Sequence, residues 1–168
     1  TAALDRKLTR APGGFQKRAA GIARLVRAGA RVRVTHVISS LNYRELPDFA
    51  AFAVKKLAGV SWVQFSYIKG IGRAESGLQL PRYAEVQPCL ERALFICEKN
   101  GLRCEVDHIP PCFLGGFYRL NVDIVKMKAG LPGPHLEEKE HVPACRGCRF
   151  LEVCPGPRKD YIAAHKTL

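Results

Sequence analysis

Apolar residues in the first 110 positions recur with two periods that take turns along the chain. Between residues 15 and 28 they lie three and four positions apart, which predicts an amphipathic helix that ends at Gly29. Between residues 31 and 38 apolar and polar residues alternate and β-branched side chains are frequent, which predicts a strand. The same two patterns then occur twice more, with helices at about 42–59 and 83–99 and strands at 60–68 and 102–109.

This alternation of helices and strands, with short turns between them, is typical of an α/β fold. It predicts parallel strands that are joined by crossover helices. The start of the middle helix has two interpretations. Asn42 and Glu45 resemble a capping box, whereas Pro47 is typical of the first helical position.

The regular pattern ends near Pro110, and neither period continues beyond it. Residues 129–144 combine prolines, glycines and charged residues, as a linker does. We therefore expect two parts, residues 1–110 and residues 111–168.

Each predicted strand has one polar face. Gln64 and Ser66 alternate with apolar residues in the second strand, and Glu105 and Asp107 do so in the third. Parallel strands that helices cover on both faces normally read as continuous apolar runs, and burial of an unpaired polar group costs several kcal/mol. The polar face therefore indicates a hydrated or ligand-filled interior, such as a barrel or part of one encloses. A small open sheet with one side in solvent is the alternative.

Ligands of such folds collect at the carboxyl ends of the strands. The residues expected there are Ser39, Ser40, Asn42, Ser66, Lys69 and His108. Two of them also have ordinary structural explanations, because asparagine is a common helix cap and a histidine at the end of a strand often bonds to the backbone.

A length of 168 residues fits one domain with a small appendage, and 47% hydrophobic residues suffice for a single core. No apolar run is long enough for a membrane span and no signal peptide opens the chain, so we expect a cytoplasmic protein without membrane contact. The chain begins at Thr1 instead of methionine, which suggests a processed or truncated piece.

The net charge is +12, from 27 Lys and Arg against 15 Asp and Glu, and it favours a polyanionic partner only where the basic residues cluster. Lys17, Arg24 and Arg27 share a predicted helix face, and other basic residues surround the last cysteines, but no aromatic residues are interleaved with them. A solvated basic surface is therefore favoured over nucleic-acid binding.

Three of the seven cysteines, Cys145, Cys148 and Cys154, form the pattern C-x2-C-x5-C. In a reducing compartment, metal or cluster binding explains this spacing better than disulfides do. The best fourth ligand is Cys112, which follows the third predicted strand. The other cysteines lie on apolar faces and are expected to pack in the core: Cys89, Cys97 and Cys104.

Iron–sulfur and zinc compete as the occupant of these cysteines. Structural zinc sites usually show two close pairs of ligands, whereas here one close pair joins two separate cysteines. Cys154 is followed by Pro155, as in the last cysteine of bacterial ferredoxin motifs, which favours a 4Fe-4S cluster. His135 or His141 in place of Cys112 would instead complete a zinc site.

Several stretches together resemble the radical SAM superfamily. GGFQKRAAGIARLVRAGARVRVTHVISSLNYREL resembles the third helix, the fourth strand and the entry to the fourth helix of its partial barrel. VSWVQFSYIKGIGRA resembles the fifth strand with its loop, and LRCEVDHIPPC the sixth strand. CRGCRFLEVCPGPRKDY resembles the auxiliary-cluster segment of SPASM or twitch-type members.

This resemblance implies a parallel-stranded half of a (β/α)6 partial TIM barrel in residues 1–110 and an auxiliary-cluster segment in residues 111–168. Full-length members are enzymes that cleave S-adenosylmethionine reductively, and the resulting 5′-deoxyadenosyl radical takes hydrogen from a substrate. The cofactor would lie near Ser39, Ser40, Asn42 and Ser66. An auxiliary 4Fe-4S cluster, which holds substrate or relays electrons, would be bound by Cys112, Cys145, Cys148 and Cys154. A reductant protein is an implied partner, and the substrate class stays open among peptides, nucleosides and small metabolites.

Two features depart from the family pattern. The C-x3-C-x2-C motif that holds the cofactor-cleaving cluster is absent from the 168 residues, so the chain alone is expected to be inactive. Arg158 stands where a full SPASM segment has a further cysteine, which argues for one auxiliary cluster instead of two. The alternative function belongs to a different class: a zinc-stabilised basic α/β module that binds nucleic acid.

Overall fold

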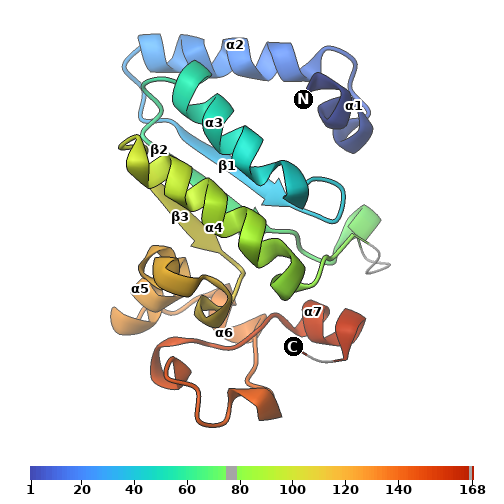
Figure 1. Ribbon diagram of the computed structural model, residues 1–168, viewed down its shortest axis with the longest axis vertical. Helices are drawn as coiled ribbons and strands as arrows, with labels where there is room; N and C mark the ends of the chain where they lie inside the picture. The colour runs from blue at the N-terminus through green and yellow to red at the C-terminus, as the bar shows by residue number, and fades with distance from the viewer. Residues whose placement is uncertain (75–78, 167) are drawn as a thin grey trace.

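The computed structural model describes residues 1–74, 79–166 and 168. Its centre is a parallel sheet in the order β1-β2-β3, formed by Arg33–Ile38, Trp62–Tyr67 and Cys104–Asp107 (Figure 1). Helix α3 (Leu46–Lys56) connects β1 to β2, and helix α4 (Tyr83–Lys99) follows β2 and leads to β3. The predicted α/β class, with parallel strands and crossover helices, is therefore confirmed.

Helices α3 and α4 pack against each other and cover one face of the sheet (Figure 1). The apolar residues of α4 recur at helical spacing, and Val86, Leu90 and Ala93 are fully buried as a result. The strands add their own apolar sets to this layer, in which Val63 and Phe65 are also fully buried. The core thus lies between the two helices and the apolar face of the sheet.

The other face of the sheet carries the polar residues. Thr35 Oγ1 donates to Gln64 Oε1 at 3.2 Å, and Trp62 Nε1 donates to Glu105 Oε1 at 3.2 Å. Within the described part of the chain, β1 and β3 form the two edges, so the sheet is open there and does not close into a barrel wall.

Two helices precede the sheet. Helix α2 (Gly14–Arg27) matches the first predicted helix, whereas α1 (Ala2–Thr9) was not predicted. The reason is its length: α1 has eight residues, fewer than the window over which a helical period of apolar residues can be recognised. Thr1 caps α1 through its Oγ1, which accepts a hydrogen bond from the N–H of Leu4 at 3.3 Å.

The capping-box interpretation of Asn42 is wrong. The side chain turns back to the end of β1, where its Oδ1 accepts from the N–H of Ser39 at 2.7 Å and its Nδ2 donates to the carbonyl of Val37 at 2.8 Å. After a single 3-10 turn the regular helix α3 begins at Leu46, with Pro47 in its first turn. The second interpretation of the helix start is thus the better one.

Residues 111–168, called the C-terminal segment below, are a series of short helices and turns, so the linker interpretation of residues 129–144 is wrong. The elements are η3 (Pro111–Phe113), η4 (Gly115–Leu120), α5 (Val122–Lys128), α6 (Pro134–Glu137), η5 (Pro143–Cys145), η6 (Leu151–Val153) and α7 (Lys159–His165). Figure 1 shows this segment below the sheet. Leu114 and Tyr161 are buried in the main core, whereas Ile124, Phe150 and Cys154 form a second, smaller cluster.

Every helix in the described ranges is too short or too polar to cross a lipid bilayer.

Candidate functional site

A cavity of about 600 Å³, called the strand-end cavity below, opens at the carboxyl ends of the strands. Five residues that the sequence predicted for this place line it together: Ser39, Asn42, Ser66, Lys69 and His108. Ser40 lies outside the lining, and its backbone N–H donates to the carbonyl of Gln79 at 3.0 Å. Helix α1 contributes Asp5, Leu8 and Thr9 to the wall.

Ser39 and Asn42 are held firmly at the end of β1. Their exposed fractions are only 2% and 4%, and Ser39 Oγ donates to Asn42 Oδ1 at 3.3 Å. With its amide bonded to both Ser39 and Val37, Asn42 closes the loop after β1. Its structural contribution is therefore to shape one wall of the strand-end cavity.

His108 has a left-handed backbone conformation, with φ of 65°, which is uncommon outside glycine. Its Nδ1 lies 3.3 Å from Oδ1 of Asp107, and neither buried atom makes a hydrogen bond. Burial lowers the pKa of His108 to about 4; Asp107 opposes this effect, and the cations of Lys139, Arg158 and Lys69 add to it. The imidazole is therefore neutral at neutral pH.

An ion-pair network joins the rim of this cavity to the C-terminal segment. Lys69 Nζ donates to both carboxylate oxygens of Glu138, at 2.7 and 3.0 Å. Arg158 donates to Glu138 at 2.6 Å and to Asp160 at 2.9 and 2.7 Å, and Asp160 also accepts from the N–H of Gly70 at 2.7 Å. Although partial burial raises the pKa of Glu138, the hydrogen bonds from Lys69 and Arg158 lower it to about 2.

Two of the predicted cluster ligands, Cys145 and Cys148, lie in one turn of the C-terminal segment, called the cysteine turn below, and Cys154 comes after η6. The N–H of Cys148 donates to the carbonyl of Cys145 at 3.0 Å, across a turn in which Gly147 has φ of 74°. Cys148 packs with Cys154 in the small apolar cluster. The sulfur of Cys154 accepts a hydrogen bond from the N–H of Gly156 at 3.3 Å.

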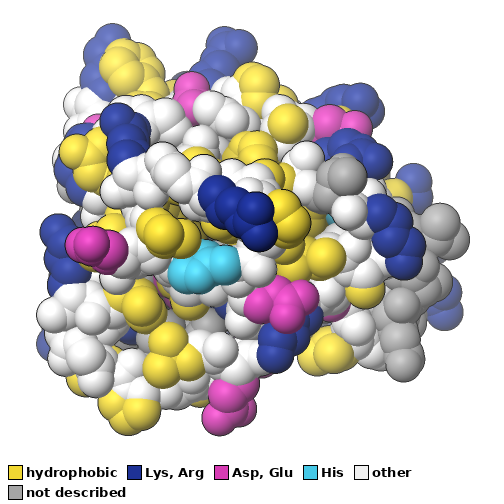
Figure 2. Space-filling model, turned by 90° about the horizontal axis from the view of Figure 1, so that it is seen from below, with side chains coloured by type: hydrophobic (Ala, Val, Ile, Leu, Met, Phe, Trp, Pro, Cys, Tyr) yellow, Lys and Arg dark blue, Asp and Glu magenta, His cyan; other side chains and the backbone are white. Residues whose placement is uncertain are grey.

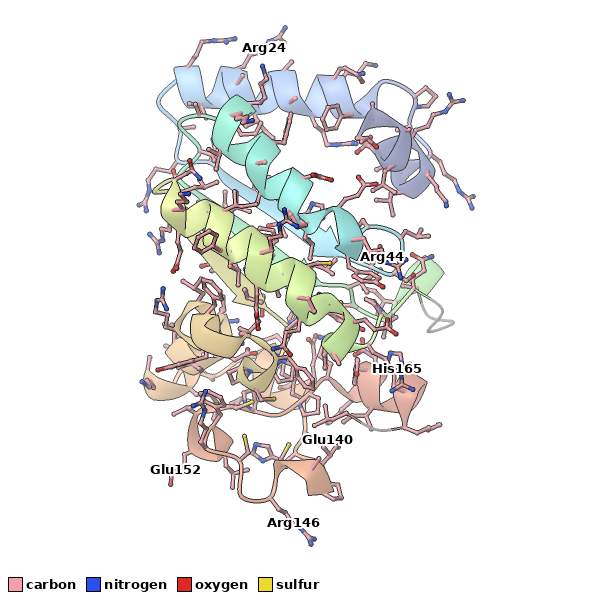
Figure 3. The ribbon with its side chains drawn as sticks, viewed as in Figure 1. Arg24, Arg44, Glu140, Arg146, Glu152 and His165 are labelled. Atoms are coloured by element: carbon pink, nitrogen blue, oxygen red, sulfur yellow. The ribbon has the colours of Figure 1, made fainter. Side chains whose placement is uncertain are left out.

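Cys112, in η3, is an electrostatic neighbour of these three thiols. Partial burial and the thiols of Cys148 and Cys145 raise the pKa of Cys112 to about 11. Burial, together with the thiols of Cys112 and Cys145, likewise raises the pKa of Cys154 to about 11. The sequence-distant cysteines are therefore neighbours, and Figure 3 shows sulfur atoms gathered in the C-terminal segment.

All seven cysteines are free thiols. In the described residues no three His, Cys, Asp or Glu side chains are arranged so that they could hold a single metal ion as they stand. The four thiols are thus neighbours without being drawn together around one point.

The remaining predicted metal ligands and core cysteines differ in their surroundings. His141 lies beside Cys154, with its Nε2 2.7 Å from the carbonyl oxygen of that residue. The side chain of His135 lies outside the described part of the structure. Cys97 and Cys104 are buried in the main core and Cys89 packs against it, as the sequence predicted.

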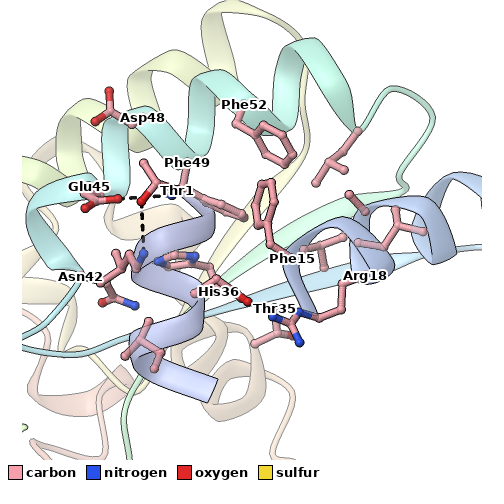
Figure 4. Close-up of a pocket in the computed structure, with 17 residues that line it drawn as sticks. Thr1, Phe15, Arg18, Thr35, His36, Asn42, Glu45, Asp48, Phe49 and Phe52 are labelled. Atoms are coloured by element: carbon pink, nitrogen blue, oxygen red, sulfur yellow. Dashed lines mark hydrogen bonds and ion pairs between the residues drawn. The ribbon is translucent and has the colours of Figure 1, made fainter. Parts of the chain in front are cut away.

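A second cavity, of about 400 Å³, separates α1 and α2 from β1 and α3 (Figure 4). Phe15 and Phe52 meet across it with ring centroids 5.3 Å apart, and His36 lies on Phe49 with centroids 4.2 Å apart. Burial lowers the pKa of His36 to about 4. Its wall combines aromatic and aliphatic residues with the charged side chains of Arg18, Glu45 and Asp48.

Basic side chains are dispersed on the face that Figure 2 shows, with acidic ones between them. One aromatic residue does lie among arginines: Trp62 has the guanidinium carbons of Arg33 and Arg103 at 6.0 and 5.4 Å from its ring centroid. The sequence did not reveal this row because its members come from β1, from β2 and from the residue before β3. The indole also donates to Glu105 of β3.

Comparison with protein-family models, with curated proteins and with solved structures found no match to this chain.

Sequence reasoning missed two parts of the strand-end region. Asp107 was noted only as a polar strand residue, and Arg158 as a basic residue beside the cysteines and as the residue that replaces a further cysteine. The contact of Asp107 with His108 depends on a backbone angle, and the pairing of Arg158 with Glu138 depends on the path of the C-terminal segment. Neither leaves a local signal in the sequence.

Proposed function

We propose that this chain is the carboxyl-terminal part of a radical SAM enzyme and that Cys112, Cys145, Cys148 and Cys154 hold an auxiliary 4Fe-4S cluster. The observation that carries the proposal is the proximity of Cys112, which follows the last strand, to three cysteines of the C-terminal segment. The parallel sheet with its crossover helices is compatible with half of a (β/α)6 partial barrel, which is the finer fold we propose.

The chemistry of the four thiols fits a cluster. A single tetrahedral zinc ion holds sulfur at about 2.3 Å, which brings four sulfurs into mutual contact, whereas a cubane cluster is a larger body with a cysteine at each iron. The spacing of one close pair with two separate cysteines, and the proline after Cys154, favour the larger body.

The neighbouring thiols raise one another's pKa, and bound iron would reverse that effect by stabilising the thiolates. The N–H of Gly156 already points at the sulfur of Cys154, and such hydrogen bonds to sulfur tune the reduction potential of clusters. The apolar contacts of Ile124 and Phe150 would shield this side of the site from water.

In the full-length enzyme, S-adenosylmethionine and a second 4Fe-4S cluster would supply the 5′-deoxyadenosyl radical for hydrogen abstraction. The role of this chain would be to bind and orient. Ser39 and Asn42 shape the strand-end cavity, and Ser66 presents a hydroxyl in its wall, so we place cofactor and substrate there. Ser40, outside the lining, would contribute through the loop that follows β1.

Anaerobic reconstitution with iron and sulfide tests the cluster. The chain should take up about four irons and show the broad absorption of a 4Fe-4S centre. Cys112→Ala and Cys148→Ala should each lose most of the iron, because each removes one ligand from the cluster. Cys89→Ala, which changes a half-buried cysteine of α4 that packs against the main core, is the matched control and should retain it.

Uptake of one zinc per chain without any iron would contradict the cluster. In that case nucleic-acid binding by a zinc-stabilised module becomes the better proposal. The affinity of the chain for single-stranded RNA should then fall steeply as the salt concentration rises. Iron uptake that survives Cys112→Ala would reject Cys112 as a ligand.

A further inference from the structure

The cavity between α1, α2, β1 and α3, called the aromatic cavity below, leaves three phenylalanines incompletely packed. Phe15 of α2 and Phe49 and Phe52 of α3 line this cavity and stay only partly buried (Figure 4). The volume of about 400 Å³ lies within the usual range for small-molecule sites. Apolar ring surface of this kind favours a ligand that is itself apolar or aromatic.

Two buried polar atoms in the wall of the aromatic cavity have no hydrogen-bond partner in the described residues. They are Nε2 of His36 and Oδ2 of Asp5. Polar atoms that are buried without a partner are costly, and they are rare in folded proteins. The ring of His36 lies on Phe49, so this nitrogen belongs to the same wall as the phenylalanines. The cavity thus combines apolar ring surface with two polar atoms that a ligand can satisfy.

The chemistry of these two atoms selects the polar group of the ligand. Burial, with a smaller contribution from the amino group of Thr1, lowers the pKa of His36 to about 4, so its imidazole is neutral at neutral pH. A nitrogen of a neutral imidazole either accepts or donates, depending on the tautomer, whereas an ionised carboxylate oxygen only accepts. A hydroxyl group both donates and accepts. It therefore suits His36 in either tautomer, and it also suits Asp5.

The charged groups of the wall disfavour a charged ligand. Arg18 is paired with Asp5. Glu45 is paired with the amino group of Thr1. Asp48 is exposed, so its charge stays in contact with water. A charged group that entered beside the imidazole would lose its water without gaining a free counter-ion from these residues. The expected ligand is therefore uncharged.

We infer that the aromatic cavity binds a small uncharged aromatic molecule with a hydroxyl group, that is, a phenol. Its ring lies against the phenylalanines, and its hydroxyl group is bonded to Nε2 of His36. This inference goes beyond the proposed function, because it requires neither the iron–sulfur cluster nor S-adenosylmethionine.

The aromatic cavity and the strand-end cavity are neighbours that share part of their walls, His36 included. The three phenylalanines line only the aromatic cavity, whereas Ser66, Lys69 and His108 line only the strand-end cavity. A phenol against the phenylalanines therefore leaves the strand-end cavity to the charged cofactor.

Titration of the nitrogen-15-labelled chain with phenol and with toluene, followed by amide NMR at neutral pH, tests the inference. Phenol should shift amide resonances around the aromatic cavity, on α2, β1 and α3. Benzoate and benzylammonium should bind there at least about tenfold more weakly, because each must bury a charge. Toluene has the same ring without a hydroxyl group, so the ratio of the toluene to the phenol dissociation constant reports the hydrogen bond.

His36→Phe keeps the ring contact with Phe49 and removes the nitrogen. In this variant the ratio of the two dissociation constants should fall about fivefold, which is the loss expected for one hydrogen bond. Ala19→Phe is the second variant. Ala19 lies in the wall of the aromatic cavity, so a larger side chain there should fill the space and abolish the binding of both probes while the chain stays folded.

Four results would overturn the inference: no phenol shift at the aromatic cavity, an unchanged ratio in His36→Phe, benzoate or benzylammonium binding as strongly as phenol, or phenol binding that survives Ala19→Phe. Iron uptake is measured separately, so this inference and the proposed function can fail independently.

Discussion

Arg158 is the residue that connects the strand-end region to the C-terminal segment. Its side chain is 6% exposed and is shared between Glu138 and Asp160, whose exposed fractions are 29% and 22%. A buried charge is tolerated only with such partners, and removal of the cation would leave Glu138 with Lys69 and would leave Asp160 without its cation in a partly dry environment.

Arg158→Ala should therefore lower the free energy of unfolding by about 2 kcal/mol, less than the loss of a fully buried partner because both carboxylates keep some water. Arg146→Ala is the matched control, since Arg146 is exposed and points away from the molecule (Figure 3). Urea unfolding monitored by circular dichroism measures both. Equal stability of the two variants would contradict the structural role of Arg158.

Two buried histidines predict how stability depends on pH. Burial lowers the pKa of both His36 and His108 from 6.5 to about 4. Between pH 6.5 and about pH 4 the two histidines are therefore protonated in the unfolded chain but not in the folded chain. The free energy of unfolding should therefore fall as the pH is lowered from 6.5 to about 4. The lowered pKa of Glu138 adds a further loss only as its carboxylate becomes protonated, below about 4.5.

His36→Phe tests this assignment, because phenylalanine keeps the ring contact with Phe49 and removes the titrating group. The variant should show a shallower decline across the same pH window, measured by urea unfolding at a series of pH values. A decline of unchanged steepness would show that other groups control it.

At the scale of elements, the cysteine turn and the chain that follows it depend on two glycines with different surroundings. Gly156 has φ of 95°, and a Cβ there would lie 2.1 Å from the carbonyl oxygen of Glu140. Gly147 has φ of 74°, but a Cβ there would meet nothing within 4 Å. Both substitutions strain the backbone, and only the one at Gly156 also produces a clash with another backbone segment.

Gly147→Ala should thus cost about 1 kcal/mol for the left-handed conformation alone. Gly156→Ala should cost about 1–3 kcal/mol more, because the backbone at Glu140 cannot move aside as a flexible side chain could. Under the proposed function it should also reduce iron uptake, since Gly156 donates to the sulfur of Cys154. Urea unfolding and iron analysis of the two variants compare these effects; equal losses would reject the close approach to Glu140.

At the scale of the whole molecule, the end of the chain returns to the main core. Tyr161 of α7 is 1% exposed and stacks on Tyr83 of α4 with ring centroids 3.8 Å apart and planes inclined by 9°. Its hydroxyl accepts from the N–H of Tyr83 at 3.3 Å. The C-terminal segment therefore contributes to the stability of the layer that covers the sheet.

Tyr161→Ala should destabilise the fold by about 3–5 kcal/mol, as the truncation of a buried aromatic residue does. Tyr118→Ala, at a position that is 42% exposed, should cost less than about 1 kcal/mol. Thermal unfolding of both variants checks this. If Tyr161→Ala leaves the melting temperature unchanged, the end of the chain and the sheet are independent in stability, as the boundary predicted near residue 111 would have it.

The sequence by itself determined the elements whose signal is local. Periods of 3.6 and 2 residues identified the helices and strands around the sheet, because a buried face imposes its spacing on neighbouring residues. Their alternation implied parallel pairing, because a helix between two strands is long enough to return the chain to the end of the sheet where the first strand began. Helix α1 escaped prediction because its eight residues are too few to show a clear helical period.

Only the tertiary structure decided which side chains meet. It turned Asn42 toward β1, set His108 against Asp107, joined Arg158 to Glu138 and made Cys112 a neighbour of the later cysteines. Each of these contacts depends on backbone angles at turns and on residues distant in the chain. A local sequence pattern therefore gives no sign of it. The spacing of residues in the sequence can identify candidate ligands and polar groups, whereas the path of the folded chain decides which of them lie together.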